Sequence, residues 1–444
     1  MGEPDSCIAF DPQYEFGEPN KSVLLGRDEA TVEDDKEKQL FSGKAEIRLD
    51  LLPKPGIHVY VSQTTPSLLD PDSFHTLVLK SNSLRIDGFP ANTKSSPATG
   101  ISVTWCPWSE PIIGRGDEGS EMKSLVFHLF NFKEILGASR YDERIGTTSR
   151  AIEHVTLQNS DWKIDLRSLS QSSRTFKELK EMGGYGLTHL GCMVKQDKTS
   201  FTGKEAEEMM VSLCFFLSFA KGVWCQPLCL VGLDENKNRV WEHWSSPWDI
   251  WSTPRSWFTE RKSQQIVELF PLFMIRWADE KWKSTFREVI YWYLNSNRYR
   301  EIDTGIILTQ TAIERLSFDY VVKERRLLEA EGFKTLRASD KFRLLFSSLD
   351  IPIDIPQYSA DIQLMAKQFN WLDAPQALTE IRNSLVHPEH KRRGQFNDAE
   401  YDAWNLGLWY LELAILRLCD YTGTYHNRLL KNSRVGQVED VPWK

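Results

Sequence analysis

The sequence predicts a multidomain α+β protein with a β-rich N-terminal domain, a mixed middle region and a C-terminal bundle made only of helices. Three observations support this prediction. The chain has 444 residues, which is long for a single hydrophobic core. Short alternating runs separated by turn residues fill its first third, and helical periodicity fills its last third. We place the domains at residues 1–165, 166–260 and 261–444, with the bundle itself at about 300–430.

The N-terminal domain is predicted from runs that alternate between apolar and polar residues. Residues 45–51 (AEIRLDL) alternate strictly, as a half-buried strand does. Further candidate strands lie at residues 57–61, 76–79, 84–86, 101–105 and 124–130. Segments rich in proline and glycine separate them and have the composition of loops. This pattern is typical of an antiparallel sandwich or a barrel-like domain.

The middle region mixes both kinds of element. Residues 185–191 are predicted to form a strand, and Thr202 is predicted to cap a helix that runs to about Lys221. Residues 226–233 and 239–243 are predicted to form a hairpin, which a loop rich in proline and tryptophan follows at residues 245–256. We interpret the many tryptophans of this part chiefly as packing material, because burial of aromatic rings dominates core energetics.

The C-terminal third has the periodicity of helices. We predict helices at residues 264–277, 279–295, 303–330, 338–349, 358–370, 374–387 and 398–421. In the last of these, apolar residues between Leu406 and Leu418 point in nearly every direction. A helix of that kind is buried on all sides, so we expect it at the centre of the bundle.

Composition excludes several classes of protein. The net charge of -8 argues against a protein that coats nucleic acid without specificity. The seven cysteines lack the paired spacing of a zinc site, and we expect them to be reduced thiols. No signal peptide and no apolar run long enough to cross a membrane are present, so we expect a cytoplasmic protein. No nucleotide-binding glycine motif appears, and we expect neither a cofactor nor a metal.

One predicted helix has well-marked limits, at residues 374–387. Asp373 is a good N-cap, Pro375 suits the first turn, and Pro388 disfavours helical geometry at the residue before it. At 100° per residue, one stripe of this helix is apolar. The stripe consists of Ala374, Ala377, Leu378, Ile381 and Leu385.

Three polar side chains collect on the other side of this helix, near its C-terminal end. Asn383 lies opposite the apolar stripe. His387 is four residues further on and lies on the same face as Asn383, and Arg382 lies at the flank of that face. An imidazole can move protons near neutral pH, and a guanidinium can hold a phosphate and stabilise its added charge. Such a set could cut RNA without a metal. A short basic cluster that could grip the RNA backbone follows at His390, Lys391, Arg392 and Arg393.

The segment Arg382-Asn383-Ser384-Leu385-Val386-His387 resembles the R-N-x-x-x-H signature of HEPN endoribonucleases. The motif also lies where that family has it, on a late helix of a C-terminal all-α bundle that one more long helix follows. The layout of most of the chain is similar to that of ApeA-type phage-defence proteins, and the segments at residues 184–191 and 215–224 resemble the central part of those proteins. The resemblance implies that Arg382 and His387 are the catalytic pair and that Asn383 supports them.

The resemblance also implies partners and a biological role. HEPN ribonucleases typically form homodimers in which two such helices face each other and make one composite site. The implied products are a 2′,3′-cyclic phosphate and a 5′-hydroxyl, and transfer RNA is one class of target. The implied role is toxin-like growth arrest of an infected bacterium, which is abortive infection. The N-terminal domain, at residues 1–165, would then sense a phage-derived trigger or hold the nuclease inactive.

Structural interpretations remain open beside the enzymatic one. His387 could be a C-cap that only satisfies helix carbonyls, and the chain could be a non-catalytic RNA-binding, nucleotide-binding or scaffolding protein. His189 is best explained as a core histidine, and His243 could mark a pocket but has no partner set. Glu314 is best explained as a solvated position on its helix, although a dimer could bring it to the site.

Overall fold

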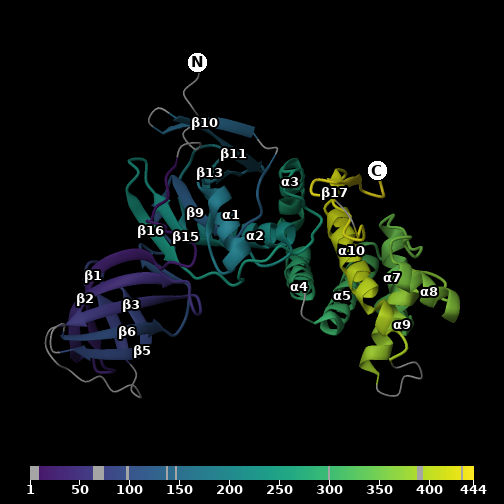
Figure 1. Ribbon diagram of the computed structural model, residues 1–444, viewed down its shortest axis with the longest axis horizontal. Helices are drawn as coiled ribbons and strands as arrows, with labels where there is room; N and C mark the ends of the chain where they lie inside the picture. The colour runs from purple at the N-terminus through teal and green to yellow at the C-terminus, as the bar shows by residue number, and fades with distance from the viewer. Residues whose placement is uncertain are drawn as a thin grey trace.

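The computed structural model describes residues 10–63, 75–96, 100–136, 139–145, 148–298, 301–387, 394–431 and 434–444. Three regions follow one another along the longest axis of the molecule: a β-barrel, a large sheet with helices, and a group of helices (Figure 1). The β-rich first part and the helical last part agree with the predicted α+β class. None of the described helices combines the length and the apolar character that crossing a bilayer requires.

The first region is a closed barrel of six antiparallel strands. They are β1 (Val23–Glu33), β2 (Gln39–Asp50), β3 (Gly56–Gln63), β4 (His75–Leu79), β5 (Arg85–Ser96) and β6 (Gly100–Pro107), in the order β1-β2-β3-β6-β5-β4. Pairing of Ala30 with Leu79 helps to close β1 onto β4, which leaves no free edge. The five strands predicted before residue 107 all fall on these elements, whereas β1 was not predicted. The barrel is one of the two architectures that the alternating pattern indicated.

The second region is an eight-stranded sheet. Its strands are β7 (Ile112–Arg115), β9 (Ser124–Phe130), β10 (Ser139–Ile145), β11 (Thr148–Gln158), β12 (Trp162–Ser168), β13 (Leu187–Lys195), β15 (Pro227–Leu233) and β16 (Arg239–Trp244), in the order β10-β11-β12-β13-β9-β15-β16-β7. The short strands β8 (Glu121–Met122) and β14 (Phe201–Thr202) pair beside it. The hairpin of β15 and β16 confirms the one predicted from the sequence.

The predicted boundary between residues 165 and 166 falls inside this sheet. Strand β12 spans it and pairs with β11 on one side and β13 on the other. The change from barrel to sheet lies instead between β6 and β7. Both regions consist of short alternating strands, so periodicity alone does not mark the point where pairing changes partners.

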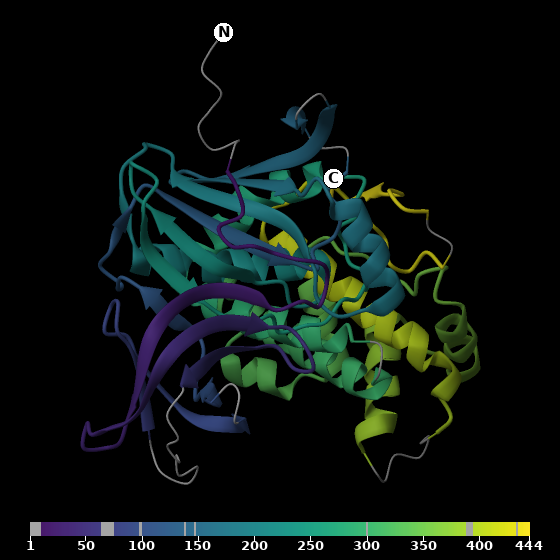
Figure 2. The ribbon, with the colours of Figure 1, turned by 60° about the vertical axis from the view of Figure 1, so that its left-hand side comes forward.

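The two faces of the sheet belong to two different cores. On β9, Leu125, Phe127 and Leu129 pack into one core with the helices, whereas Val126 and Phe130 pack into the core that includes the barrel. Successive residues of a strand point to opposite faces, which explains this division. The sheet therefore lies between barrel and helices (Figure 1), and Figure 2 shows the same three regions with the barrel turned toward the viewer.

Two helices accompany the sheet. Helix α1 (Ser172–Met182) was not predicted, whereas α2 (Gly203–Lys221) matches the predicted helix. The N-cap of α2 is a complete capping box, because Thr202 accepts from the Glu205 N–H and Glu205 accepts from the Thr202 N–H. The helix ends at Gly222, whose positive φ of 91° suits a residue without a side chain.

The remaining helices form the third region. They are α3 (Gln264–Ala278), α4 (Glu280–Ser296), α5 (Ile302–Ser317), the π-helix η1 (Phe318–Glu324), α6 (Ala330–Thr335), α7 (Ala338–Ser348), α8 (Ala360–Phe369), α9 (Ala374–Val386), the 3-10 turn η2 (Asn397–Ala399) and α10 (Glu400–Leu418). Two short strands, β17 (Thr424–Tyr425) and β18 (Glu439–Asp440), close the C-terminal tail. All but one of the predicted helices match, and α10 is buried along almost its whole length, as expected for the centre of the bundle.

The exception is the helix predicted at 303–330, which is interrupted. The α-helix stops at Ser317 and continues as a π-turn, which buries Asp319. That carboxylate accepts from Thr285 of α4 at 2.5 Å and pairs with Arg315 and Lys323. We attribute the wider turn to these contacts, because they turn the Asp319 side chain toward the core. The periodicity of the sequence does not indicate such contacts, so the interruption was not predicted.

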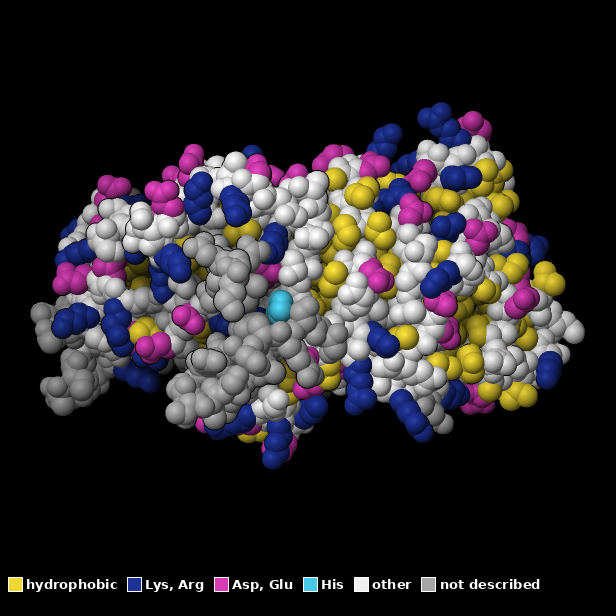
Figure 3. All heavy atoms as spheres, turned by 90° about the horizontal axis from the view of Figure 1, so that it is seen from above, with side chains coloured by type: hydrophobic (Ala, Val, Ile, Leu, Met, Phe, Trp, Pro, Cys, Tyr) yellow, Lys and Arg dark blue, Asp and Glu magenta, His cyan; other side chains and the backbone are white. Residues whose placement is uncertain are grey.

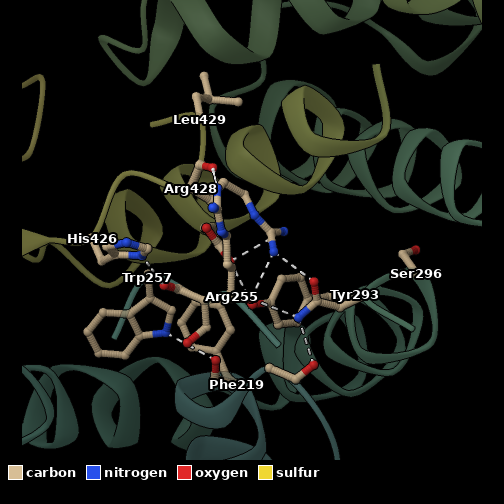
Figure 4. Close-up of polar contacts among 12 residues, drawn as sticks. Phe219, Arg255, Trp257, Tyr293, Ser296, His426, Arg428 and Leu429 are labelled. Carbon is tan, nitrogen blue, oxygen red and sulfur yellow. Dashed lines mark hydrogen bonds and ion pairs between the residues drawn. The ribbon is translucent and has the colours of Figure 1, made fainter. Parts of the chain in front are cut away.

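A buried polar cluster joins the C-terminal tail to the rest of the helical region (Figure 4). The Arg428 guanidinium donates to the Asn297 side chain at 2.7 Å and to the Arg255 carbonyl at 2.8 Å. Glu412 of α10 lies 3.6 Å from Arg428 and accepts from the Tyr293 hydroxyl at 2.7 Å. Because these groups are buried, their mutual contacts fix the tail against α4 and α10.

Candidate functional site

Helix α9 carries the polar motif and has the limits predicted from the sequence. The Asp373 carboxylate accepts from the Gln376 N–H at 2.9 Å, so Asp373 is the N-cap. The helix ends at Val386, and His387 adopts an extended conformation before Pro388. The predicted apolar stripe faces the core: Ala374, Ala377, Leu378 and Ile381 are fully buried, and Leu385 is partly buried.

Two side chains from other helices hold α9 in place. Arg343 of α7 donates to Asp373 at 3.1 Å and clamps the start of the helix. The buried Gln310 of α5 donates to the Leu378 carbonyl at 2.6 Å. In an α-helix that carbonyl is the one that accepts the backbone N–H of Arg382, so Gln310 holds the turn that carries the motif. Sequence reasoning missed both residues, although a glutamine beside the apolar stripe of α5 is a signal that could be searched for.

The three motif residues lie together at the C-terminal end of α9. Arg382 and Asn383 are half-buried, and His387 is exposed. An Nη1 of Arg382 donates to Asn383 Oδ1 at 3.3 Å, and the His387 N–H donates to the Asn383 carbonyl at 3.1 Å. Asn383 therefore connects the guanidinium with the turn that presents the imidazole. Neither the Arg382 guanidinium nor the His387 imidazole is buried in the hydrophobic core.

The charge of Arg382 has no described carboxylate to balance it. Five arginines of the helical region form ion pairs with acidic side chains, namely Arg276, Arg315, Arg343, Arg417 and Arg428. For Arg382 the described contact is an amide oxygen, which is neutral. Most of its donors are therefore available, and a planar fork of donors suits a phosphate or carboxylate.

The predicted basic cluster cannot be placed in this arrangement. His390, Lys391, Arg392 and Arg393 lie outside the described residues. Glu314, which was considered as a further contributor, forms an ion pair with Lys341 of α7 and is half-exposed, as its expected surface position implies.

Two histidines outside the motif were also considered from the sequence. His189 is fully buried, its Nδ1 is 3.0 Å from the Thr188 hydroxyl, and burial lowers its pKa to about 3. This confirms the prediction of a core histidine. Burial also lowers the pKa of His243 to about 4, and its Nε2 lies 3.7 Å from Glu207.

A cavity of about 270 Å³ lies beside the N-terminal part of α10. Its lining includes two exposed tyrosines, Tyr358 and Tyr401, together with Asp402, Arg255 and Lys431. Lys431 lies 3.6 Å from Asp402, so the carboxylate offsets one of the positive charges. The cavity thus combines flat aromatic rings with a surplus of positive charge.

Comparison with known proteins gives two matches to family models and one curated relative. Residues 117–256 match the YopA central domain, and residues 279–439 match the YopA C-terminal domain. A Bacillus subtilis (strain 168) protein described as SPbeta prophage-derived uncharacterized protein YopA is 27% identical over 448 residues, which is 97% of each chain. The chain is similar to YopA over nearly its whole length. No solved structure matches it significantly.

The two matched segments follow the architecture described above. The central-domain match covers most of the large sheet together with α1 and α2, and the C-terminal match covers α4 to α10, including the motif helix α9. The barrel lies before both matched segments. None of these descriptions names an activity, a substrate or a partner.

Proposed function

We propose that the chain is a metal-independent endoribonuclease of the HEPN type, with its cutting site at Arg382, Asn383 and His387. The observation that carries this proposal is the guanidinium of Arg382, which lacks a described carboxylate partner and lies five residues before an exposed histidine. Its remaining N–H donors have no described carboxylate partner, so they are available to an anion. A scissile phosphate is the anion that would complete the site.

The chemistry follows from the two side chains. Arg382 holds the phosphate and stabilises the charge that develops on its oxygens. An imidazole removes the proton of the 2′-hydroxyl, which attacks the adjacent phosphorus and expels the 5′-oxygen. An imidazolium returns a proton to that leaving oxygen. The products are a 2′,3′-cyclic phosphate and a 5′-hydroxyl, and the cycle needs both an imidazole and an imidazolium.

A homodimer would supply both forms of the imidazole. In one chain the motif lies on an outer surface of α9, where nothing described covers His387. A second copy would close the site and bring its own His387. The helical half exposes apolar side chains that a partner could cover, as Figure 3 shows for one face. Among the exposed residues of this region are Ile275, Leu364 and Leu372.

The biological role that we propose is growth arrest during phage infection. The similar protein is prophage-derived. A prophage survives only while its host population survives, so an RNA-cutting protein that stops an infected cell would limit a competing phage. The barrel and the large sheet would restrain the nuclease or sense the trigger, because the sheet shares one continuous core with the helices. Such a protein would act in the cytoplasm on RNA, with transfer RNA as one class of substrate.

Cleavage of RNA in EDTA tests the proposal. Purified full-length protein is incubated with total bacterial RNA, and the new ends are mapped by their phosphate chemistry. We expect ends with a cyclic phosphate from the wild type and at least a hundredfold slower cleavage from His387→Ala and from Arg382→Lys. Arg325→Ala, at an exposed arginine of the same region, is the matched control and should cut normally. Equal cleavage by His387→Ala and wild type would refute the assignment.

The second candidate is a non-catalytic nucleotide-binding protein, and the cavity beside α10 favours it. Tyr358 and Tyr401 offer rings on which a base could stack, and Lys431 and Arg255 offer charge for a phosphate. Titration with AMP and with a short RNA, followed by tyrosine and tryptophan fluorescence, tests this candidate. Saturable binding that Tyr401→Ala abolishes, together with RNA that stays intact, would favour the binding protein over the nuclease.

A further inference from the structure

Three side chains with the chemistry of a nucleophilic site meet on the outer face of the barrel. They are Asp50 at the end of β2, His58 on β3 and Cys106 on β6. Val59 of β3 is opposite Trp105 of β6, so the preceding and following residues, His58 and Cys106, are neighbours across the same pair of strands. Trp105 and Val59 are fully buried in the barrel, which turns His58 and Cys106 outward.

The His58 ring lies between the other two side chains. Its Nδ1 is 2.7 Å from Asp50 Oδ2, and Cys106 is its neighbour across the pair of strands β3 and β6. Because Nδ1 faces the carboxylate, Nε2 is the nitrogen left to face the sulfur. The order thiol, imidazole, carboxylate is the one that activates a cysteine nucleophile in unrelated folds.

The Asp50 carboxylate is held by three side chains, His58, Tyr60 and Ser22. Besides His58, it accepts from the Tyr60 hydroxyl at 2.5 Å and from the Ser22 hydroxyl at 2.7 Å. Burial of Asp50 opposes its ionisation, but the hydrogen bonds from His58, Tyr60 and Ser22 outweigh burial and lower its pKa. An ionised and immobile carboxylate fixes the orientation of the imidazole.

The charges around His58 favour the imidazolium. Its hydrogen bond to Asp50, followed by the effect of the neighbouring Cys106, raises its pKa to about 10. The Glu110 carboxylate lies near the same ring, beside Gly56. Of the positive groups, Arg48 lies opposite His58 on β2, but its guanidinium donates to Glu46. The Tyr60 hydroxyl is committed to Asp50.

Cys106 differs from the other described cysteines in its accessibility. It is half-buried, whereas Cys192, Cys214, Cys225, Cys229 and Cys419 are buried. An imidazolium beside a thiol favours the thiolate, which is the reactive form. The site lies at the junction with the large sheet, because Glu110 accepts from the Ile57 N–H of β3 and from the Ser246 N–H after β16, both at 2.7 Å.

We propose that Cys106 is the nucleophile of a second, covalent site that accepts acyl groups from esters or thioesters, with His58 as its acid and base and Asp50 as a positioning residue. The thiolate attacks the acyl carbon, so an S–C bond forms and the bond from that carbon to the leaving oxygen or sulfur breaks. The leaving group takes the Nε2 proton of His58. Water then attacks the thioester, the S–C bond breaks, and the proton returns to His58 while the carboxylic acid leaves.

The test uses the full chain and two small probes. Iodoacetamide reports the thiolate, and p-nitrophenyl acetate reports acyl transfer through the nitrophenolate released and the acetyl group found on the Cys106 peptide. We expect Cys106 to be alkylated at nearly the same rate at pH 6 and at pH 8, whereas an ordinary thiol slows about a hundredfold over that interval. Acetylation of the same peptide should follow.

Three variants separate a reactive site from a structural contact. Cys106→Ser should give no adduct on this peptide, and His58→Gln should slow alkylation at pH 6 at least tenfold and restore the pH dependence of an ordinary thiol. Tyr60→Phe keeps both contacts of His58 and removes one donor to Asp50, so it should shift the pH profile only slightly. Circular dichroism verifies that each variant is folded. If Cys106 reacts as slowly at pH 6 as an ordinary thiol, or if His58→Gln reacts like the wild type, the proposal is wrong.

Discussion

At the scale of single residues, the position of the Arg382, Asn383 and His387 motif depends on Gln310, which lies on a different helix. Gln310 of α5 is buried and donates to the Leu378 carbonyl at 2.6 Å, in the turn that leads to Arg382. The amide therefore sets the position of the guanidinium, although it lies far from it in sequence. Its effect on any chemistry at Arg382 would be indirect, through the placement of the helix.

We expect Gln310→Met to lower the free energy of unfolding by about 1 kcal/mol, because the side-chain volume is kept and one buried hydrogen bond is lost. RNA cleavage should fall more than RNA binding, since the guanidinium is misplaced and not removed. Urea denaturation followed by tryptophan fluorescence gives the stability. Gln368→Met, at an exposed position of α8, is the control and should change neither quantity. Unchanged stability of Gln310→Met would show that the hydrogen bond contributes nothing.

Buried histidines make a second prediction at this scale. The Nδ1–H of His128 donates to the Cys229 carbonyl at 3.0 Å, and its Nε2 accepts from the Gln13 N–H at 3.2 Å. Both contacts suit the neutral ring, and burial lowers its pKa from 6.5 to about 4. Between those values the unfolded chain binds a proton that the folded chain does not. Stability is therefore fully present above pH 6.5 and falls as the pH drops toward 4.

Between pH 6.5 and pH 4, His128 alone should lower the free energy of unfolding by an amount on the order of 3 kcal/mol. Unfolding by urea at a series of pH values between 7 and 4 measures it. His128→Gln keeps a donor and an acceptor but cannot titrate, so its stability should depend less steeply on pH over this interval. Parallel profiles of the variant and the wild type would contradict the assignment.

At the scale of elements, the capping box of α2 is the clearest case in which local sequence fixes local structure. Thr202 and Glu205 satisfy each other's backbone N–H groups at the start of the helix. We expect Thr202→Ala to lower the free energy of unfolding by about 1 kcal/mol, the usual value of an N-cap. Thr311→Ala, on an exposed face of α5, is the matched control and should be neutral or slightly stabilising. Equal effects of the two substitutions would mean that the cap is not what stabilises α2.

The predicted helices and strands differed in how closely their bounds agree with the structure. Helices with a clear period, such as α2 and α9, were predicted almost to the residue, whereas β2 begins six residues before its predicted start. The helix predicted at 303–330 was not, because contacts of Asp319 with Thr285 and Lys323 accompany a π-turn that periodicity cannot show. Strand β1 was missed because its sequence, VLLGRDEATVE, alternates poorly and becomes a strand through its partners β2 and β4.

At the scale of the whole molecule, the proposed nuclease needs a second copy. One chain presents Arg382 and His387 on an open surface, whereas acid and base catalysis needs two imidazole states. Specific activity should therefore fall when the protein is diluted below its dimerisation constant. Cleavage rates per chain over a hundredfold range of concentration, compared with masses from light scattering, test this. A rate per chain that stays constant while the protein is a monomer would contradict the composite site.

The sequence by itself determined the class of the fold, the ends of the motif helix and the three residues placed at its exposed end, because these depend on local period, caps and proline. Only the tertiary structure decided how the strands are shared between barrel and sheet, since pairing partners lie far apart in sequence. It also brought Asp50 and His58 to Cys106, and Gln310 to α9. Such contacts form when separate elements pack, and no spacing along the chain encodes them.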